Sequence, residues 1–180
     1  MDHLINSDDH EALTELYRRY ADRLLGYFIK MFKGDVQKSQ DFLQELFIKI
    51  WEKKHQFDSN RKFYTWVFTI ASNMCKTDFR KQADLSLENQ SEFKSKTVNA
   101  EDIYDKSIIK KILKEKIMGL EPNHRSAFIL RYIEGFTLIE IAEITDANVG
   151  TIKSRLFYAT KKLAEELKEF KTHFNNESYG

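Results

Sequence analysis

The sequence predicts an all-α protein with two small helical domains joined by a flexible linker, the C-terminal one a helix-turn-helix. Three observations predict this fold class. Apolar residues recur at helical spacing through most of the chain. Glycine and proline are scarce, at six and one among 180 residues, which argues against turn-rich sheet folds. The periodicity is lost over residues 84–105, where Ser, Asn and Glu are frequent.

Composition excludes several other classes of protein. Hydrophobic residues make up 42% and charged residues 32% of the chain, which is unlike an intrinsically disordered sequence. One cysteine excludes a disulfide framework and a multi-cysteine zinc site, and the five histidines form no HxxxH pair. The chain has no membrane-length apolar run, no N-terminal signal-peptide pattern and no Gly-rich phosphate loop. We therefore expect a cytoplasmic protein with no metal, no other cofactor and no membrane span.

Three helices are predicted for the N-terminal domain, residues 1–83. The first is capped by Asp8 or Asp9 and runs to about Met31. Gly34 and Asp35 interrupt the pattern, and Asp35 can cap the second helix. After a loop at residues 57–60, the third helix carries an apolar stripe with a basic continuation to Gln82. That stripe consists of Phe63, Trp66, Val67, Ile70, Ala71 and Met74.

The C-terminal domain, residues 106–170, follows the predicted linker and precedes a tail at 171–180. One helix ends before Pro122, and another runs from there to about Ile133. Thr137 and Glu140 form a capping-box pattern that starts a short helix. A turn at residues 145–148 then leads into a further helix, with Asn148 as its cap. Two short helices joined by such a turn predict a helix-turn-helix.

The net charge of +1 hides two basic islands. Residues 61–83 carry five basic side chains and one acidic one, whereas residues 149–162 carry four basic and no acidic ones. Either island alone is also consistent with a solvated surface. Two islands on two helices with apolar stripes indicate two separate contacts with a polyanion such as DNA.

The two basic helices offer different chemistry to DNA. The last helix has a polar, solvent-facing side that suits contacts with phosphates and base edges in a duplex groove. This face shows Thr151, Lys153, Ser154, Arg155, Tyr158, Lys161 and Lys162. The third helix mixes aromatic and basic side chains, a combination that suits unstacked single-stranded DNA. Its candidate contacts are Tyr64, Asn73, Lys76, Arg80 and Lys81.

A third candidate surface lies on the second helix, away from its main apolar stripe. It comprises Asp41, Gln44, Glu45, Ile48 and Lys49. One interpretation is ordinary solvated surface. The other is a docking face on which Ile48 is an apolar anchor beside acids that meet a basic partner. The residues alone leave both interpretations open.

The chain resembles the extracytoplasmic-function type of bacterial sigma factor. The segment Ser39–Trp51 is similar to the helix that grips RNA polymerase, Phe63–Lys81 to the segment that opens the −10 element, and Leu120–Leu163 to the region that binds the −35 element. The resemblance implies that the five residues on the second helix are a polymerase face. It likewise implies that the five candidates on the third helix are a −10 face, and that the last helix carries a −35 face. The −35 face comprises Thr151, Lys153, Ser154, Arg155, Phe157, Tyr158 and Lys161.

The resemblance also implies the partners and the type of activity. These partners are core RNA polymerase, through its beta and beta-prime subunits, promoter DNA and an anti-sigma factor. The protein would not be an enzyme, since polymerase supplies the catalysis, and the acidic linker would run toward the polymerase cleft. The chain departs from the family where Glu121 precedes Pro122 and where Tyr158 replaces a commonly basic residue.

Two other functions compete with this interpretation. A helix-turn-helix regulator that binds duplex DNA without polymerase would explain residues 120–163 but not the aromatic and basic third helix. A helical adaptor would use its basic helices to bind protein or RNA. Run-off transcription with sigma-free core polymerase distinguishes both from a sigma factor.

Overall fold

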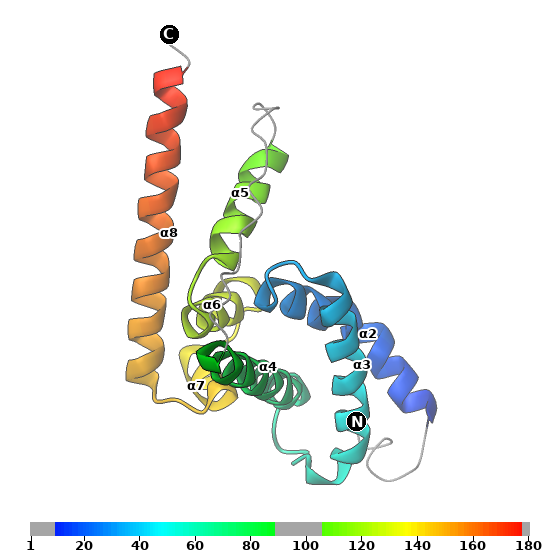
Figure 1. Ribbon diagram of the computed structural model, residues 1–180. Helices are drawn as coiled ribbons and strands as arrows, with labels where there is room; N and C mark the ends of the chain where they lie inside the picture. The colour runs from blue at the N-terminus through cyan, green and yellow to red at the C-terminus, as the bar shows by residue number, and fades with distance from the viewer. Residues whose placement is uncertain (1–9, 89–105, 178–180) are drawn as a thin grey trace.

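A computed structural model describes residues 10–88 and 106–177 of the chain, and every regular element within them is helical. The all-α prediction is therefore confirmed (Figure 1). The N-terminal region consists of α2 (His10–Met31), α3 (Val36–Glu52), the 3-10 turn η1 (Lys54–Gln56) and α4 (Phe63–Glu88). The C-terminal region consists of α5 (Lys106–Met118), α6 (Pro122–Phe128), the π-helical turn η2 (Ile129–Ile133), α7 (Leu138–Thr145) and α8 (Val149–Glu177).

Local sequence signals set the starts of several helices. Asp35 caps α3, and its Oδ1 accepts a hydrogen bond from the Lys38 amide at 3.0 Å. Gly34 precedes this cap with a φ of +90°, a conformation that glycine adopts without strain. Pro122 lies in the first turn of α6, where its missing amide hydrogen costs no helical hydrogen bond.

Two predicted boundaries differ from the observed helices. The third predicted helix and its basic continuation form the single helix α4, which runs five residues past position 83 to Glu88. Residues 84–88 therefore belong to a helix rather than to the linker. The remainder of the predicted linker, 89–105, and the caps Asp8 and Asp9 lie outside the described residues. At the other end, α8 extends to Glu177, into the predicted tail.

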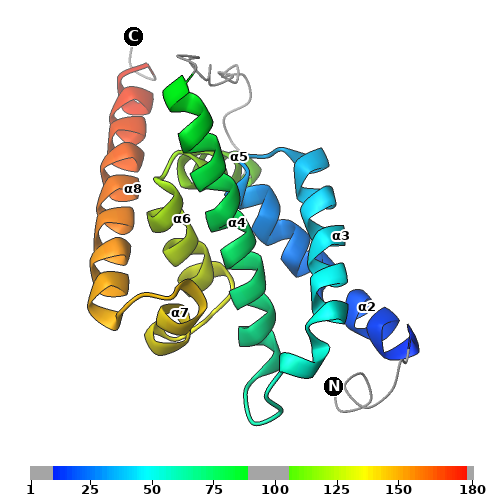
Figure 2. The same ribbon diagram turned by 60° about the horizontal axis from the view of Figure 1, so that its bottom comes forward.

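The helix α4 lies between the two regions, with α2 and α3 along one side and α6 and α7 along the other (Figure 2). Apolar side chains cover both of these sides of α4. Val67, Ile70 and Ala71 belong to the predicted stripe, whereas Phe68 lies outside it and is fully buried. A helix that is apolar on two sides is buried between two layers.

The buried side chains of both regions form one continuous cluster. Leu24, Leu46 and Ile50 lie in its N-terminal part, and Ile141 and Ile152 lie in its C-terminal part. The two domains are thus recognisable in the chain, but their cores are not separate. None of the helices in the described ranges is both long and apolar enough to cross a membrane.

Candidate nucleic-acid and polymerase interfaces

The helix-turn-helix is built by two caps and a left-handed turn. Thr137 Oγ1 accepts a hydrogen bond from the Glu140 amide at 3.2 Å, and Glu140 Oε2 accepts one from the Thr137 amide at 2.8 Å. The predicted capping box is therefore confirmed. Asp146 ends α7 with a φ of 50°. Asn148 Oδ1 then accepts a hydrogen bond from the Thr151 amide at 2.7 Å, as expected for the cap of α8.

The −35 face is open to solvent over most of its residues. Ile152, Leu156 and Ala159 are buried and fix α8 against the rest of the C-terminal region. Opposite them, five members of the face are exposed and two are half-buried. The exposed members are Lys153, Ser154, Phe157, Tyr158 and Lys161, and the half-buried ones are Thr151 and Arg155. The structure thus places all seven predicted residues on one helix with their cations available to an anionic ligand.

Two exposed aromatic rings extend this face. Phe157 is 61% exposed and Tyr158 is 55% exposed, and their ring centroids lie 5.4 Å apart. The Tyr158 ring also stacks against His124 of α6, with centroids 6.0 Å apart. Tyr158 therefore offers a hydroxyl and a ring where a basic side chain would offer a charge.

The −10 face of α4 is partly occupied by the C-terminal region. Asn73, Lys76, Arg80 and Lys81 are exposed, but Tyr64 is half-buried. The Tyr64 hydroxyl donates a hydrogen bond to Glu134 Oε2 at 2.6 Å, and its ring stacks on Phe136 with centroids 5.0 Å apart. Burial raises the pKa of the Tyr64 phenol, and the hydrogen bond to Glu134 raises that pKa further. Tyr64 is thus held as a protonated donor inside a contact between the two regions.

Sequence reasoning missed two cations of the first basic island as contact residues. Arg61 Nη1 lies 2.7 Å from Glu143 Oε1, and Lys62 Nζ lies 2.8 Å from Glu140 Oε1. Both cations precede α4, and both acids belong to α7. The hydrogen bond from Lys62 lowers the pKa of the Glu140 carboxyl group, as does the bond from the Thr137 amide. The charge of the island was visible in the sequence, but its acidic partners lie about eighty positions away.

The one acid of this basic island, Asp78, is neutralised within the N-terminal region. Lys38 Nζ lies 2.7 Å from Asp78 Oδ2, and both side chains are largely buried. Lys38 Nζ also lies 4.8 Å from the centroid of the Phe32 ring. The ion pair joins α3 to α4, so the outward charge of α4 near this point comes from Arg80 and Lys81.

The polymerase face lies on the solvent side of α3. Asp41, Gln44, Glu45 and Ile48 are exposed, and Ile48 is 59% exposed despite its apolar side chain. Lys49 Nζ pairs with Glu45 Oε1 at 3.1 Å, one helical turn away. The structure therefore presents an exposed apolar residue together with exposed acids on one face of α3.

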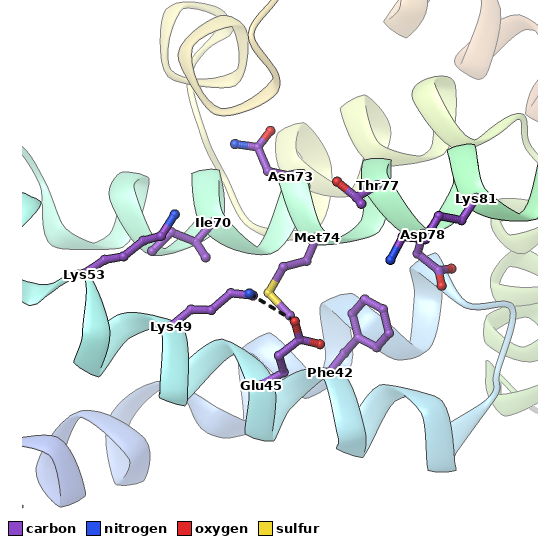
Figure 3. A pocket seen from close by; sticks show the side chains of 10 residues that line it. All are labelled: Phe42, Glu45, Lys49, Lys53, Ile70, Asn73, Met74, Thr77, Asp78 and Lys81. Atoms are coloured by element: carbon purple, nitrogen blue, oxygen red, sulfur yellow. Dashed lines mark ion pairs between the residues drawn. The ribbon is translucent and has the colours of Figure 1, made fainter.

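A groove of about 410 Å³ connects the polymerase face with the −10 face (Figure 3). Glu45 and Lys49 border it from α3, and Asn73 and Lys81 border it from α4. Phe42, Ile70 and Met74 supply its apolar lining. Lys53 and Thr77 also line it and were not among the predicted site residues. The spacing of residues within one helix gives no information about a groove formed by two.

The described residues contain no cluster of three or more His, Cys, Asp or Glu side chains that could hold a metal ion. Cys75 is buried, and its burial raises the pKa of the thiol, which favours the unreactive protonated form. Cys75 therefore serves as a small packing residue in the core.

Known proteins match the two regions separately and the chain as a whole. Residues 16–84 match the family Sigma-70 region 2, and residues 110–163 match Sigma-70, region 4. The ECF RNA polymerase sigma factor SigW of Bacillus subtilis is 29% identical over 176 residues, covering 92% of this chain and 94% of that protein. The ECF RNA polymerase sigma-E factor of Escherichia coli K12 is 29% identical over 171 residues, covering 88% of each.

Two solved structures share the arrangement of helices. The sigma factor RpoE, determined in complex with the anti-sigma factor NepR from Bartonella quintana, superposes with a TM-score of 0.73 at 25% identity. The match covers 88% of this chain and 98% of that one. CnrH, in complex with the cytosolic domain of CnrY, shows the same fold with a TM-score of 0.67 at 20% identity, covering 93% and 94%. The two matched regions, in this order on one all-helical chain, place the protein in the sigma-70 family as a sigma factor of the extracytoplasmic-function type.

Proposed function

We propose that this sigma factor uses three separate faces: α3 for core RNA polymerase, α4 for the −10 element and α8 for the −35 element. The chain directs promoter-specific transcription initiation, and the polymerase carries out the chemistry. The observation that supports this division most is the simultaneous exposure of an acidic face on α3 and of a basic, aromatic face on α8. A regulator that acts without polymerase would not require the first of these.

At the polymerase face, Ile48 supplies apolar contact area, while Asp41 and Glu45 attract basic residues of the beta or beta-prime subunit. Gln44 and Lys49 complete the same face with hydrogen-bonding groups. Because like charges placed opposite each other across an interface repel strongly, we expect reversal of both acids to weaken docking strongly. No covalent chemistry is required of any of these residues, so the chain is not itself an enzyme.

At the promoter, α8 enters the major groove of the −35 duplex through Lys153, Ser154 and Arg155. On α4, Lys76, Arg80 and Lys81 neutralise backbone phosphates beside the −10 element. Asn73 hydrogen-bonds a base that has left the stack, and Tyr64 offers a ring on which a base can stack. Asn73 lies on the wall of the groove between α3 and α4, next to the polymerase face.

The relatives also suggest a regulatory partner and a compartment. RpoE from Bartonella quintana was determined with an anti-sigma factor bound. We propose that an anti-sigma factor likewise regulates this chain, in the cytoplasm, where core polymerase operates. The predicted linker would connect the two regions along the polymerase cleft.

The test is run-off transcription from a promoter library with sigma-free core polymerase. The chain should give specific initiation that core polymerase alone does not give. The double variant Asp41→Lys with Glu45→Lys should lose both co-purification with core polymerase and initiation. The matched control is Asp22→Lys with Glu115→Lys, which reverses two exposed acids outside the proposed faces and should retain both. Duplex binding without initiation would instead identify a regulator that acts without polymerase.

A further inference from the structure

Tyr158 of the −35 face is supported by a residue of another helix, His124 of α6. The two rings stack with their centroids 6.0 Å apart and their planes at 29°. The helices α6 and α8 pack against each other, and His124 is half-buried next to the fully buried Arg125. Tyr158 is 55% exposed, so its ring stays open to a ligand while His124 supports it from the side of α6.

The two partners of the Tyr158 ring differ in how firmly they are fixed. Phe157 meets this ring nearly edge-on, with centroids 5.4 Å apart and planes at 76°, but Phe157 belongs to the same helix and is 61% exposed. His124 belongs to a helix that the buried residues 125–127 anchor in the core. The imidazole is therefore the fixed member of this cluster of rings, and the Tyr158 side chain is the member that it restrains.

Restraint matters at this position because tyrosine is neutral. A hydrogen bond from a hydroxyl depends strongly on its direction, whereas the attraction between a cation and a phosphate depends mainly on distance. A basic residue, which is common at this position in the family, attracts phosphates from a range of side-chain conformations. Tyr158 can replace such a contact only when its hydroxyl points toward the phosphate.

A ring conformation that exists before binding also favours affinity. An exposed aromatic side chain that becomes ordered on DNA loses rotamer freedom, and this loss weakens binding. A ring that already stacks on a fixed neighbour has less freedom to lose. Tyrosine hydroxyls are among the side-chain groups that contact DNA phosphates. The stacked pair therefore suits a phenol that is oriented before the duplex binds.

We infer that His124 is a positioning residue of the −35 face, which holds the Tyr158 ring by stacking so that the hydroxyl donates to a phosphate oxygen of the duplex. This inference rests on the proposed function of α8. It adds α6 to the elements that shape the −35 face, although His124 itself does not contact the DNA. The effect of His124 on duplex binding therefore depends on the presence of Tyr158.

The test is a double-mutant cycle on duplex binding by the full-length chain, followed by fluorescence anisotropy. The probe is a fluorescently labelled 20-base-pair duplex of mixed sequence, because a phosphate contact requires no particular sequence. The four proteins are the wild type, His124→Ala, Tyr158→Ala and the double variant. A fifth protein, His124→Phe, keeps a ring for stacking but has no ring nitrogen. The matched control is Asn123→Ala, at the neighbouring exposed position of α6.

His124→Ala and Tyr158→Ala should each weaken duplex affinity about threefold. The double variant should bind no more weakly than Tyr158→Ala alone, because the effect of His124 acts through the tyrosine. His124→Phe and Asn123→Ala should stay within about 1.5-fold of the wild type. Thermal unfolding followed by circular dichroism shows whether each variant is folded at the temperature of the assay.

The inference is overturned if His124→Ala leaves the affinity unchanged or weakens it equally in the Tyr158→Ala background. It is also overturned if His124→Phe binds as weakly as His124→Ala, since the imidazole would then contact DNA directly. In each of these results the wild type still binds duplex, so the proposed −35 face stands. A wild type that binds no duplex would refute that face and the inference together.

Discussion

The helices α4 and α8 carry similar sequence signals but have different environments. Each carries part of a basic island, and both combine cations with aromatic residues. On α8, the aromatic residues Phe157 and Tyr158 are exposed beside the cations. On α4, Phe68 is buried and Tyr64 is bound to Glu134, so the aromatic residues join two parts of the protein. The comparison teaches that cations and aromatic residues on a helix predict an interface. They do not indicate whether DNA or another part of the same protein contacts it.

The largest difference between the two helices should appear in stability. Phe68→Ala removes a fully buried ring and should lower the free energy of unfolding by about 3–5 kcal/mol. Phe157→Ala truncates a ring that is 61% exposed and should change that free energy by less than about 0.5 kcal/mol. Urea unfolding followed by circular dichroism measures both. Equal decreases would contradict the assignment of the two rings to different environments.

A second difference should appear in duplex binding. Lys153→Ala with Arg155→Ala should weaken binding to −35 duplex by about tenfold or more. It should also make the slope of log K against log salt shallower by about 0.9 for each phosphate that is no longer neutralised. The matched control is Lys111→Ala with Lys114→Ala, which removes two exposed cations from α5. Fluorescence anisotropy across a salt series provides the measurement, and an unchanged slope in the α8 variant would place the DNA contact elsewhere.

Tyr158 offers a smaller test in the opposite direction. Tyr158→Arg places a cation where the −35 face has an exposed ring. We expect duplex affinity to rise about threefold at low salt and the salt slope to steepen by about 0.9, since one more phosphate is neutralised. The same anisotropy assay measures both quantities. An equal gain in single-strand affinity would contradict a specific effect on duplex binding, because it would indicate a nonspecific effect of charge.

The smallest expected effect concerns the pH dependence of the contact between the regions. The pKa of Glu140 is lowered in the folded state from its usual 4.5, chiefly by the hydrogen bond from Lys62. Its contribution to stability is therefore complete above pH 4.5 and is lost as the pH falls through the lower folded pKa. The free energy of unfolding of the wild type should exceed that of Glu140→Gln by no more than about 1 kcal/mol at pH 7. This difference should shrink below pH 4.5. Urea unfolding of both proteins from pH 7 to pH 3 tests this. A difference in unfolding free energy that grows as the pH falls would contradict the prediction.

Local structure was largely predictable because its causes are local. Asp35, Asn148 and the pair Thr137 and Glu140 act as caps in the structure as the sequence indicates. Helix boundaries were less predictable, as at the end of α4, where the helix continues through exposed residues after its apolar stripe has ended. A second apolar row on α4, at Tyr64, Phe68, Cys75 and Phe79, was the available signal that this helix is covered on two sides.

The candidate faces were predictable as positions but not as environments. Every residue predicted for the −35 face lies on one helix with its cations available, because helical spacing determines which residues share a face. The partners of Tyr64, Arg61 and Lys62 lie 70 to 82 positions away in the chain. No periodic pattern reports a contact over that separation. The groove between α3 and α4 was unpredictable for the same reason.

The buried aromatic residues shared by the two regions should make the regions unfold together. Separating the two regions would bring Tyr27, Phe68 and Phe136 into water, all of which are buried in the structure. Calorimetry of the free chain should therefore record one cooperative melting transition instead of two. A partner that holds the two regions apart would therefore have to cover these aromatic rings with its own side chains.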